Sequence, residues 1–201
     1  MNSFTTDSAI DFSDRTPAPG VDKLFYQRWS PRTFKKTEIP SATLTAIFDA
    51  ARWSPSCYNE QPWLFVTSSG PDDFDSFLDL LVEGNQSWAR NASLIGFIFA
   101  KKTFTHNDTE NRFGAFDCGA AWMSLTLQAA KYGLYTHGMG GIKRAAVAST
   151  LNISEQDYDV VCGFALGALN TPDVLDQDAQ PEVKVSARNP LTTVWQPGIK
   201  R

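Results

Sequence analysis

The chain has 201 residues, of which 42% are hydrophobic and 20% charged, and its mean hydropathy is -0.26. These values are typical of one soluble globular domain, so we expect neither a disordered chain nor a membrane protein. The net charge of -4 and the isoelectric point near 5.1 argue against a nucleic-acid partner, because such proteins carry basic surfaces that match phosphates. We therefore expect a small-molecule partner.

Cysteine and histidine usage narrows the expected chemistry further. The three cysteines are widely spaced and form no CxxC motif, which is typical of a reducing compartment. With two histidines and no paired cysteines, the chain offers no recognisable Zn or Fe site. Residues 1–20 form a polar arm without the basic start and apolar core of a signal peptide, so we expect a cytoplasmic protein.

A single domain is predicted over residues 21–201, and its first helix over residues 21–28, with Leu24 and Phe25 turned inward. Ser41 is the expected N-cap of a second helix. That helix carries apolar residues at the spacing of one helix face: Leu44, Ile47, Phe48 and Ala51.

A loop over residues 54–62 leads into a strand predicted over residues 63–67. A third helix is expected between Pro71 and Gly84, because apolar residues recur there at helical spacing and glycine often ends a helix. Residues 94–100 are continuously apolar and predict a strand that is covered on both faces.

Residues 101–112 predict a polar, mobile connection, and residues 116–132 predict a helix that is apolar around most of its circumference and capped by Gly133. One small sheet cannot cover such a helix, so either it lies at the centre of the domain or a second subunit covers its outer face. A strand, a helix and a strand follow, over residues 135–137, 143–151 and 158–166. The proline-containing tail has too few apolar residues for a core of its own, and a short extended piece is expected over residues 183–186.

The polar segment RWSPR predicts a binding site for an anion. Arg28, Ser30 and Arg32 alternate, so in an extended segment their side chains face the same way and present two guanidinium groups and a hydroxyl to one ligand. A phosphate monoester matches that arrangement. The alternative is that these residues cap a helix end and pair with surface acids.

Two further groups of residues have the chemistry to contact a flat polar ligand. Asn59 and Asn85 carry amides that pair with a heterocycle edge, although each is also a common turn residue. Gly140 and Gly141 follow a strand and precede a helix, where backbone N–H groups approach a flat or anionic ligand closely. Neither a GxGxxG fingerprint nor a P-loop occurs in the chain.

Nucleophilic catalysis finds little support, because there is no GxSxG motif. His106 is expected in a solvated loop, and His137 is expected to be a packed residue rather than a base. Cys57 lies in a polar loop that could border a ligand, whereas the other two cysteines lie in apolar runs. Trp29 and Trp88 border the polar segments and are candidates for the wall of a pocket.

The chain contains five motifs in this order: RWSPRTF, ARWSPSCYNEQPWLF, NQSWARNAS, GMGG and SARNPL. With these motifs, the sequence from about residue 24 to residue 191 resembles the nitroreductase family of FMN-dependent oxidoreductases. The resemblance implies an α+β fold, with a mixed, mainly antiparallel sheet flanked by helices. It also implies an intertwined homodimer in which FMN lies at the interface and the C-terminal tail crosses to the partner subunit.

The resemblance also implies which residues bind the cofactor. Arg28, Ser30 and Arg32, with Trp29 between them, match the family segment that holds the FMN phosphate and the ring edge. Arg188 matches a late arginine on the phosphate. The loop beside the flavin, donated by the other subunit, is matched by Pro55, Ser56, Cys57 and Asn59. The pyrimidine end and the N5 side of the flavin are matched by Asn85, Gly140 and Gly141.

Three positions depart from the family pattern. Trp29 replaces a basic residue, Cys57 replaces a serine, and Trp88 replaces a lysine that some members carry. These changes make the pocket less cationic and more aromatic, which bears on the substrate range rather than on FMN binding.

The implied function is an FMN-dependent NAD(P)H oxidoreductase that transfers hydride by a ping-pong cycle to nitroaromatic or quinone-type acceptors. Flavin N5 carries the chemistry, so no catalytic side chain and no metal are expected. Arg32, Asn85 and the Gly140 region are expected to stabilise the reduced flavin. The alternatives are a specialised flavin dehydrogenase or dehalogenase of the same fold, and a flavin-binding protein without catalysis.

Overall fold

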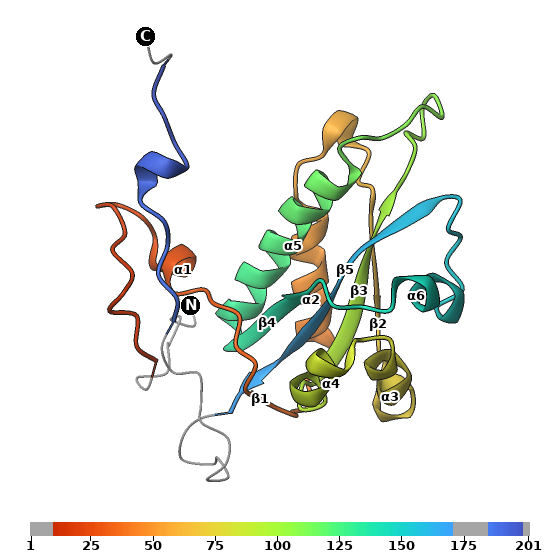
Figure 1. Ribbon diagram of the computed structural model, residues 1–201, viewed down its shortest axis with the longest axis horizontal. Coiled ribbons are helices and arrows are strands. Elements are labelled where there is room, and N and C mark those ends of the chain that lie inside the picture. The colour runs from red at the N-terminus through yellow and green to blue at the C-terminus, as the bar shows by residue number, and fades with distance from the viewer. Residues whose placement is uncertain (1–9, 171–184, 199–201) are drawn as a thin grey trace.

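The computed structural model of the protein describes residues 10–170 and 185–198. The helices are α1 (Lys23–Tyr26), α2 (Ser41–Arg52), α3 (Pro71–Asp79), α4 (Glu83–Ala89), α5 (Gly114–Lys131) and α6 (Arg144–Thr150), with 3-10 turns at η1 (Cys57–Asn59) and η3 (Leu191–Thr193). The strands are β1 (Phe34–Lys35), β2 (Trp63–Thr67), β3 (Leu94–Lys101), β4 (Leu134–Met139) and β5 (Tyr158–Leu169). Figure 1 shows one sheet with helices on both faces, and α1 with the blue C-terminal segment beside it.

The sheet is built around β5, which pairs along both of its edges. Residues 163–166 of β5 pair with β3 and also with β4, so these two strands lie on opposite edges of β5. The β2 strand extends the sheet beyond β3, and β1 pairs with the last residues of β5. Every strand pairing within the described residues is antiparallel. The expected α+β fold with a mainly antiparallel sheet is therefore present.

Side chains of β3 alternate between two hydrophobic cores, one on each face of the sheet. Ile95 and Phe97 pack with buried residues of α3, α4 and α6. Leu94 and Ile98 pack with buried residues of α2 and α5. Because β3 is buried on both faces, the sequence shows a continuous apolar run there instead of alternation. The strand predicted from that run is confirmed.

The first two helices begin differently from expectation. The α1 helix is a single turn, too short to bury both of its apolar residues, and Phe25 is 53% exposed. The α2 helix begins at Ser41 itself, and no side chain caps it. The backbone N–H groups of Thr43 and Leu44 donate to the Pro40 carbonyl instead. Ser41 was therefore wrongly predicted as the N-cap.

Gly84 does not end the third helix. The α3 helix ends at Asp79, because the chain then extends so that Leu81 pairs with Ile142 in an isolated bridge. Gly84 lies inside α4, a short helix that the sequence did not predict. A long-range pairing therefore overrides the local helical spacing.

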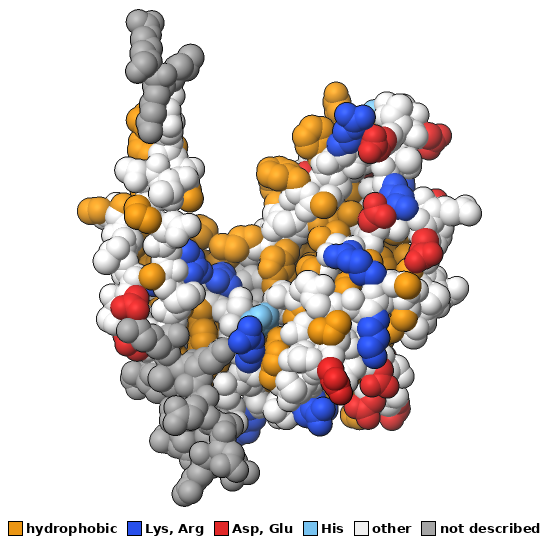
Figure 2. Space-filling view, viewed as in Figure 1, with side chains coloured by type: hydrophobic (Ala, Val, Ile, Leu, Met, Phe, Trp, Pro, Cys, Tyr) orange, Lys and Arg blue, Asp and Glu red, His pale blue; other side chains and the backbone are white. Residues whose placement is uncertain are grey.

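The α5 helix and the connection before it, over residues 101–112, follow β3 along the chain. Gly133 follows α5 with a φ of 70°, which confirms the predicted cap. Residues 101–112 fold back on themselves through a bridge between Thr103 and Glu110, and they are more ordered than the mobile connection we expected. Figure 2 shows hydrophobic side chains along α5, beside a hollow that separates this helix from the N-terminal arm.

The described part of the tail lies against the N-terminal arm, where the Val185 N–H donates to the Asp11 carbonyl at 3.1 Å. Of the extended piece predicted over residues 183–186, residues 183 and 184 lie outside the described residues. So do residues 171–182 and 199–201 of the tail expected to cross to a partner. Among the described ranges, no helix is both long enough and apolar enough to cross a bilayer.

Candidate functional site

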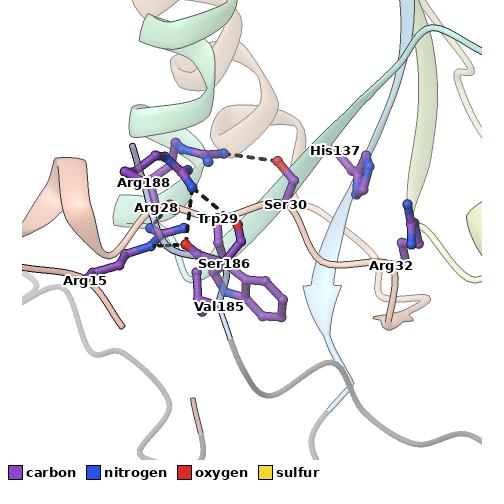
Figure 3. A pocket seen from close by; sticks show the side chains of 9 residues that line it. All are labelled: Arg15, Arg28, Trp29, Ser30, Arg32, His137, Val185, Ser186 and Arg188. Atoms are coloured by element: carbon purple, nitrogen blue, oxygen red, sulfur yellow. Dashed lines mark hydrogen bonds between the residues drawn. The ribbon is translucent and has the colours of Figure 1, made fainter. Parts of the chain in front are cut away.

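A cavity of about 320 Å³ opens where the N-terminal arm, the segment after α1, the β4 strand and the C-terminal segment meet. Figure 3 shows its lining residues. They are Arg15, Arg28, Trp29, Ser30, Arg32, His137, Val185, Ser186 and Arg188. Four of these are arginines and none is a carboxylate. The cavity is therefore strongly cationic in a protein whose net charge is negative.

Three arginines of the cavity, Arg15, Arg28 and Arg188, lie close together. Arg28 Nη1 donates to the Ser30 hydroxyl at 3.1 Å, and Arg32 lines the same cavity as these two residues. Burial lowers the pKa of Arg28, and the charge of Arg188 lowers it further. Burial also lowers the pKa of Arg15 to about 10, with the charges of Arg188 and Arg28 adding to the effect. A bound anion would relieve this repulsion.

Trp29 forms the buried base of the cavity. It is 5% exposed, and its ring meets Tyr135 edge-on at 6.2 Å between centroids. Its indole Nε1–H is buried and has no hydrogen-bond partner among the described residues. Because buried donors in proteins are nearly always paired, this one indicates an ordered water or a ligand atom beside Trp29.

Arg32 and His137 line the end of the cavity away from Arg15, on the right in Figure 3. Nδ1 of His137 lies 2.9 Å from the Pro31 carbonyl oxygen. Because a carbonyl only accepts, Nδ1 must carry the proton of this hydrogen bond. The ring of Trp88 lies 4.7 Å from the His137 ring, so α4 covers this side of the histidine.

Asn85, in the same helix as Trp88, meets the turn between β4 and α6. Its Nδ2 donates to the Gly141 carbonyl at 3.0 Å, and the Val82 N–H donates to the same oxygen at 3.1 Å. A Cβ on Gly141 would lie 2.7 Å from Asn85 Nδ2, so this contact requires glycine. A Cβ on Gly140 would meet nothing within 4 Å, which leaves its backbone approachable. Asn85 and the two glycines are thus brought together.

The loop that contains Pro55, Ser56, Cys57 and Asn59 does not join this cavity within one chain. It lies between the end of α2 and the start of α5, where the Cys57 N–H donates to the buried carboxylate of Asp117 at 3.0 Å. Three of its residues, Tyr58, Asn59 and Gln61, have φ between 52° and 58°. This left-handed backbone needs strong support, because it costs a residue with a side chain about 1–2 kcal/mol.

Residues 26–168 match the family model described as the nitroreductase family. The chain belongs to the nitroreductase family. A Streptomyces coelicolor protein with the provisional name NADH dehydrogenase/NAD(P)H nitroreductase is 22% identical over 193 residues, which cover 90% of each chain.

Solved structures agree with this assignment. One, described as an oxidoreductase containing FMN, is 37% identical with a TM-score of 0.83 and covers 97% of this chain and 98% of its own. Another, an Exiguobacterium sibiricum protein provisionally named as a nitroreductase and solved in complex with FMN, has a TM-score of 0.70 at 19% identity. It covers 96% of this chain and 99% of its own.

In this nitroreductase-family chain, four cavity residues were not identified as site residues from the sequence: Arg15, His137, Val185 and Ser186. Arg15 lies in the polar arm with no motif around it, and it also lies outside the residues that match the family model. His137 was interpreted as a packed residue, yet it both packs on Trp88 and lines the cavity. Its position at the end of the strand predicted over residues 135–137, directly before the glycines, was the available signal.

Proposed function

We propose that this chain is an FMN-dependent oxidoreductase that uses NAD(P)H as electron donor and delivers hydride to nitroaromatic or quinone-type acceptors. The observation that carries the proposal is the cavity with four arginines and no carboxylate, next to a buried indole N–H without a partner. The FMN-containing relative at 37% identity supports the cofactor, and the named Streptomyces relative supports the donor.

The residues present fit the phosphate of FMN. A phosphate monoester carries a charge of about -1.5 to -2 at neutral pH and has three strong acceptor oxygens. An arginine guanidinium group can donate two hydrogen bonds to a pair of phosphate oxygens. Arg28 and Arg188 lie so close together that the charge of Arg188 lowers the pKa of Arg28. Ser30 and the Trp29 N–H add neutral donors. We assign the phosphate to these four residues.

We propose that the flavin ring extends from the cavity toward Asn85, Gly140 and Gly141, which do not line the cavity themselves. We assign Arg32 to the ring edge, Asn85 to the pyrimidine end, and the backbone of Gly140 and Gly141 to the N5 side. FMN, when bound, supplies reversible hydride transfer, and the protein supplies binding and electrostatics. A positive guanidinium and amide donors at these places would stabilise negative charge on a reduced ring. No side-chain acid or base is required.

We extend the proposal to a homodimer in which the loop over residues 55–59 reaches the partner's flavin. Its separation from the arginine cavity within one chain supports this arrangement. So does the outer stripe of α5, which we define as Phe116, Gly119, Met123 and Leu127. These residues share one helix face, and Phe116 is 77% exposed.

Purified protein should be yellow and should release FMN on denaturation. Anaerobic NADH or NADPH should bleach the bound flavin, and nitrofurazone or menadione should restore its colour. Colourless protein that binds no added FMN would overturn the proposal. Failure of both nucleotides to bleach the flavin would favour a flavin-binding protein without catalysis, and failure of both acceptors would favour a more specialised flavin reaction.

A further inference from the structure

We infer that Arg15 of the N-terminal arm is a further phosphate-binding residue, which closes the cofactor-phosphate cavity from outside the region shared with the family. The inference rests on the proposed FMN site. Arg15 lies before residues 26–168, the part of the chain that matches the family model, so family membership alone does not assign it a role.

The backbone contacts of Arg15 hold its guanidinium at the cavity. Nη1 donates to the carbonyl oxygens of Tyr26 at 2.6 Å and Arg28 at 2.7 Å, and Nε donates to the Ser186 carbonyl oxygen at 3.1 Å. One side chain therefore connects the arm, the segment after α1 and the C-terminal segment. Figure 3 shows it beside Arg28 and Ser186.

These contacts leave one end of the guanidinium for a ligand. The three hydrogen bonds use Nε and Nη1 of Arg15, and its Nη2 group has no partner among the described residues. A guanidinium has five N–H donors in a fixed planar fork, so fixing one side orients the other. Because Arg15 lines the cavity, we assign these oriented donors to the phosphate.

The charge balance of the cavity favours an anion contact for Arg15. Arg28 and Arg188 lie close enough to lower the pKa of Arg15, and no carboxylate lines the cavity to offset the three charges. Folding therefore brings like charges together without compensation from the lining. A phosphate dianion supplies that compensation, and its oxygens accept charge-assisted hydrogen bonds from arginine.

A purely structural role for Arg15 is the competing explanation, because its three bonds join three segments. Comparing FMN with riboflavin separates the two roles, since riboflavin has the same ring and lacks the phosphate. Loss of a phosphate contact weakens FMN binding alone. Loss of the hydrogen bonds that connect the three segments distorts the cavity and weakens the binding of both ligands by a similar factor.

The experiment titrates full-length apoprotein with FMN and with riboflavin, following flavin fluorescence. In Arg15→Ala, we expect the Kd for FMN to rise about tenfold to a hundredfold, the usual range for a lost hydrogen bond to a charged group, while the Kd for riboflavin is unchanged. Arg90→Ala removes one exposed arginine from the end of α4 and should change neither value.

Each outcome decides between the explanations. An unchanged Kd for FMN in Arg15→Ala, or equal weakening of FMN and riboflavin, would overturn the inference. If Arg15→Ala does not fold, Arg15→Lys is titrated instead. For the inference to stand, Arg15→Lys must raise the Kd for FMN, by a smaller factor, and leave the Kd for riboflavin unchanged. Wild-type protein that binds FMN no more tightly than riboflavin would instead contradict the proposed phosphate site itself.

Discussion

Glu60 and Thr105, 45 positions apart in the sequence, are joined by three hydrogen bonds. The Thr105 N–H lies 3.0 Å from each carboxylate oxygen of Glu60, and its hydroxyl donates to one of them. Lys101 Nζ lies 3.5 Å from the same carboxylate. The polar connection over residues 101–112 is thereby attached to the loop that we propose to contact the partner's flavin. Tyr58 adds a ring contact with Phe104 at 5.7 Å.

Glu60→Gln should loosen the loop around η1. Burial raises the pKa of Glu60, but hydrogen bonds from Thr105 and the charge of Lys101 outweigh burial, so its pKa lies below the usual range. The carboxylate therefore stabilises the folded loop above about pH 4.3, its unfolded pKa, and this contribution disappears as the pH falls through the lower folded pKa. At neutral pH, losing about 1 kcal/mol should speed hydrogen exchange in the loop roughly fivefold.

Amide hydrogen exchange with mass spectrometry measures this effect at each peptide. Glu110→Gln is the matched control, because Glu110 lies in the same connection but pairs with the exposed Arg112. It should leave exchange around η1 unchanged. Equal protection in wild type and Glu60→Gln at neutral pH would contradict the assigned role of the carboxylate.

Gly84→Ala and Gly133→Ala should change stability in opposite directions. Gly84 lies inside α4 with nothing within 4 Å of an added Cβ, so alanine should stabilise the fold by about 0.5–1 kcal/mol. Gly133 has a φ of 70°, so alanine there should destabilise it by about 1–2 kcal/mol. Thermal and urea unfolding measure both. A destabilised Gly84→Ala would support the helix end that the sequence predicted at this glycine.

A single sequence reveals the helices and strands whose apolar pattern is local, and it misses those that depend on contacts distant in the chain. The α2 helix, the β2 strand and the β3 strand were predicted because their apolar spacing is local. The α4 helix was missed because it is short and its neighbour α3 ends through a long-range pairing between Leu81 and Ile142.

The candidate site likewise contains residues that the sequence predicts and residues that it does not. Arg28, Ser30 and Arg32 were grouped from their alternation, and the structure brings all three to one cavity. Arg15 could not be predicted, because its acceptors are backbone carbonyls 11, 13 and 171 positions away in the sequence. Backbone acceptors leave no pattern of side chains for a sequence to display.

Cys57 should be the one cysteine that iodoacetamide labels in the native protein. Burial raises the pKa of Cys118 to about 12, with the charge of Asp117 adding to it, and burial raises the pKa of Cys162 to about 11. Alkylation requires the thiolate, which these two residues rarely form near neutral pH. Cys57 is partly exposed in the loop. Peptide mass mapping should find one label per native chain and three after denaturation.

Two comparisons complete the labelling test. Cys57→Ser should take no label in the native state. Bound FMN should slow labelling of Cys57 if its loop borders the flavin, as we propose. Labelling of the Cys162 peptide in native protein at a rate similar to that of Cys57 would contradict the prediction.

Phe116→Glu should convert the proposed homodimer to monomer. Phe116 is 77% exposed at one end of the outer stripe of α5, where Gly119 is also exposed, and Met123 and Leu127 further along the stripe are half-buried. Removing an aromatic anchor from an interface can cost 2 kcal/mol or more, about thirtyfold in the dissociation constant, and a buried carboxylate adds to that cost. Light scattering and analytical ultracentrifugation measure the mass.

Ala145→Glu is the matched control, because it adds the same charge to an exposed position of α6, which packs on the other face of the sheet. It should remain dimeric and retain FMN. Phe116→Glu should lose FMN as well as its partner, because the loop over residues 55–59 would no longer reach the neighbouring cavity. A monomer that retains FMN as tightly as wild type would mean that one chain completes the site alone, whereas a dimeric Phe116→Glu would place the interface elsewhere.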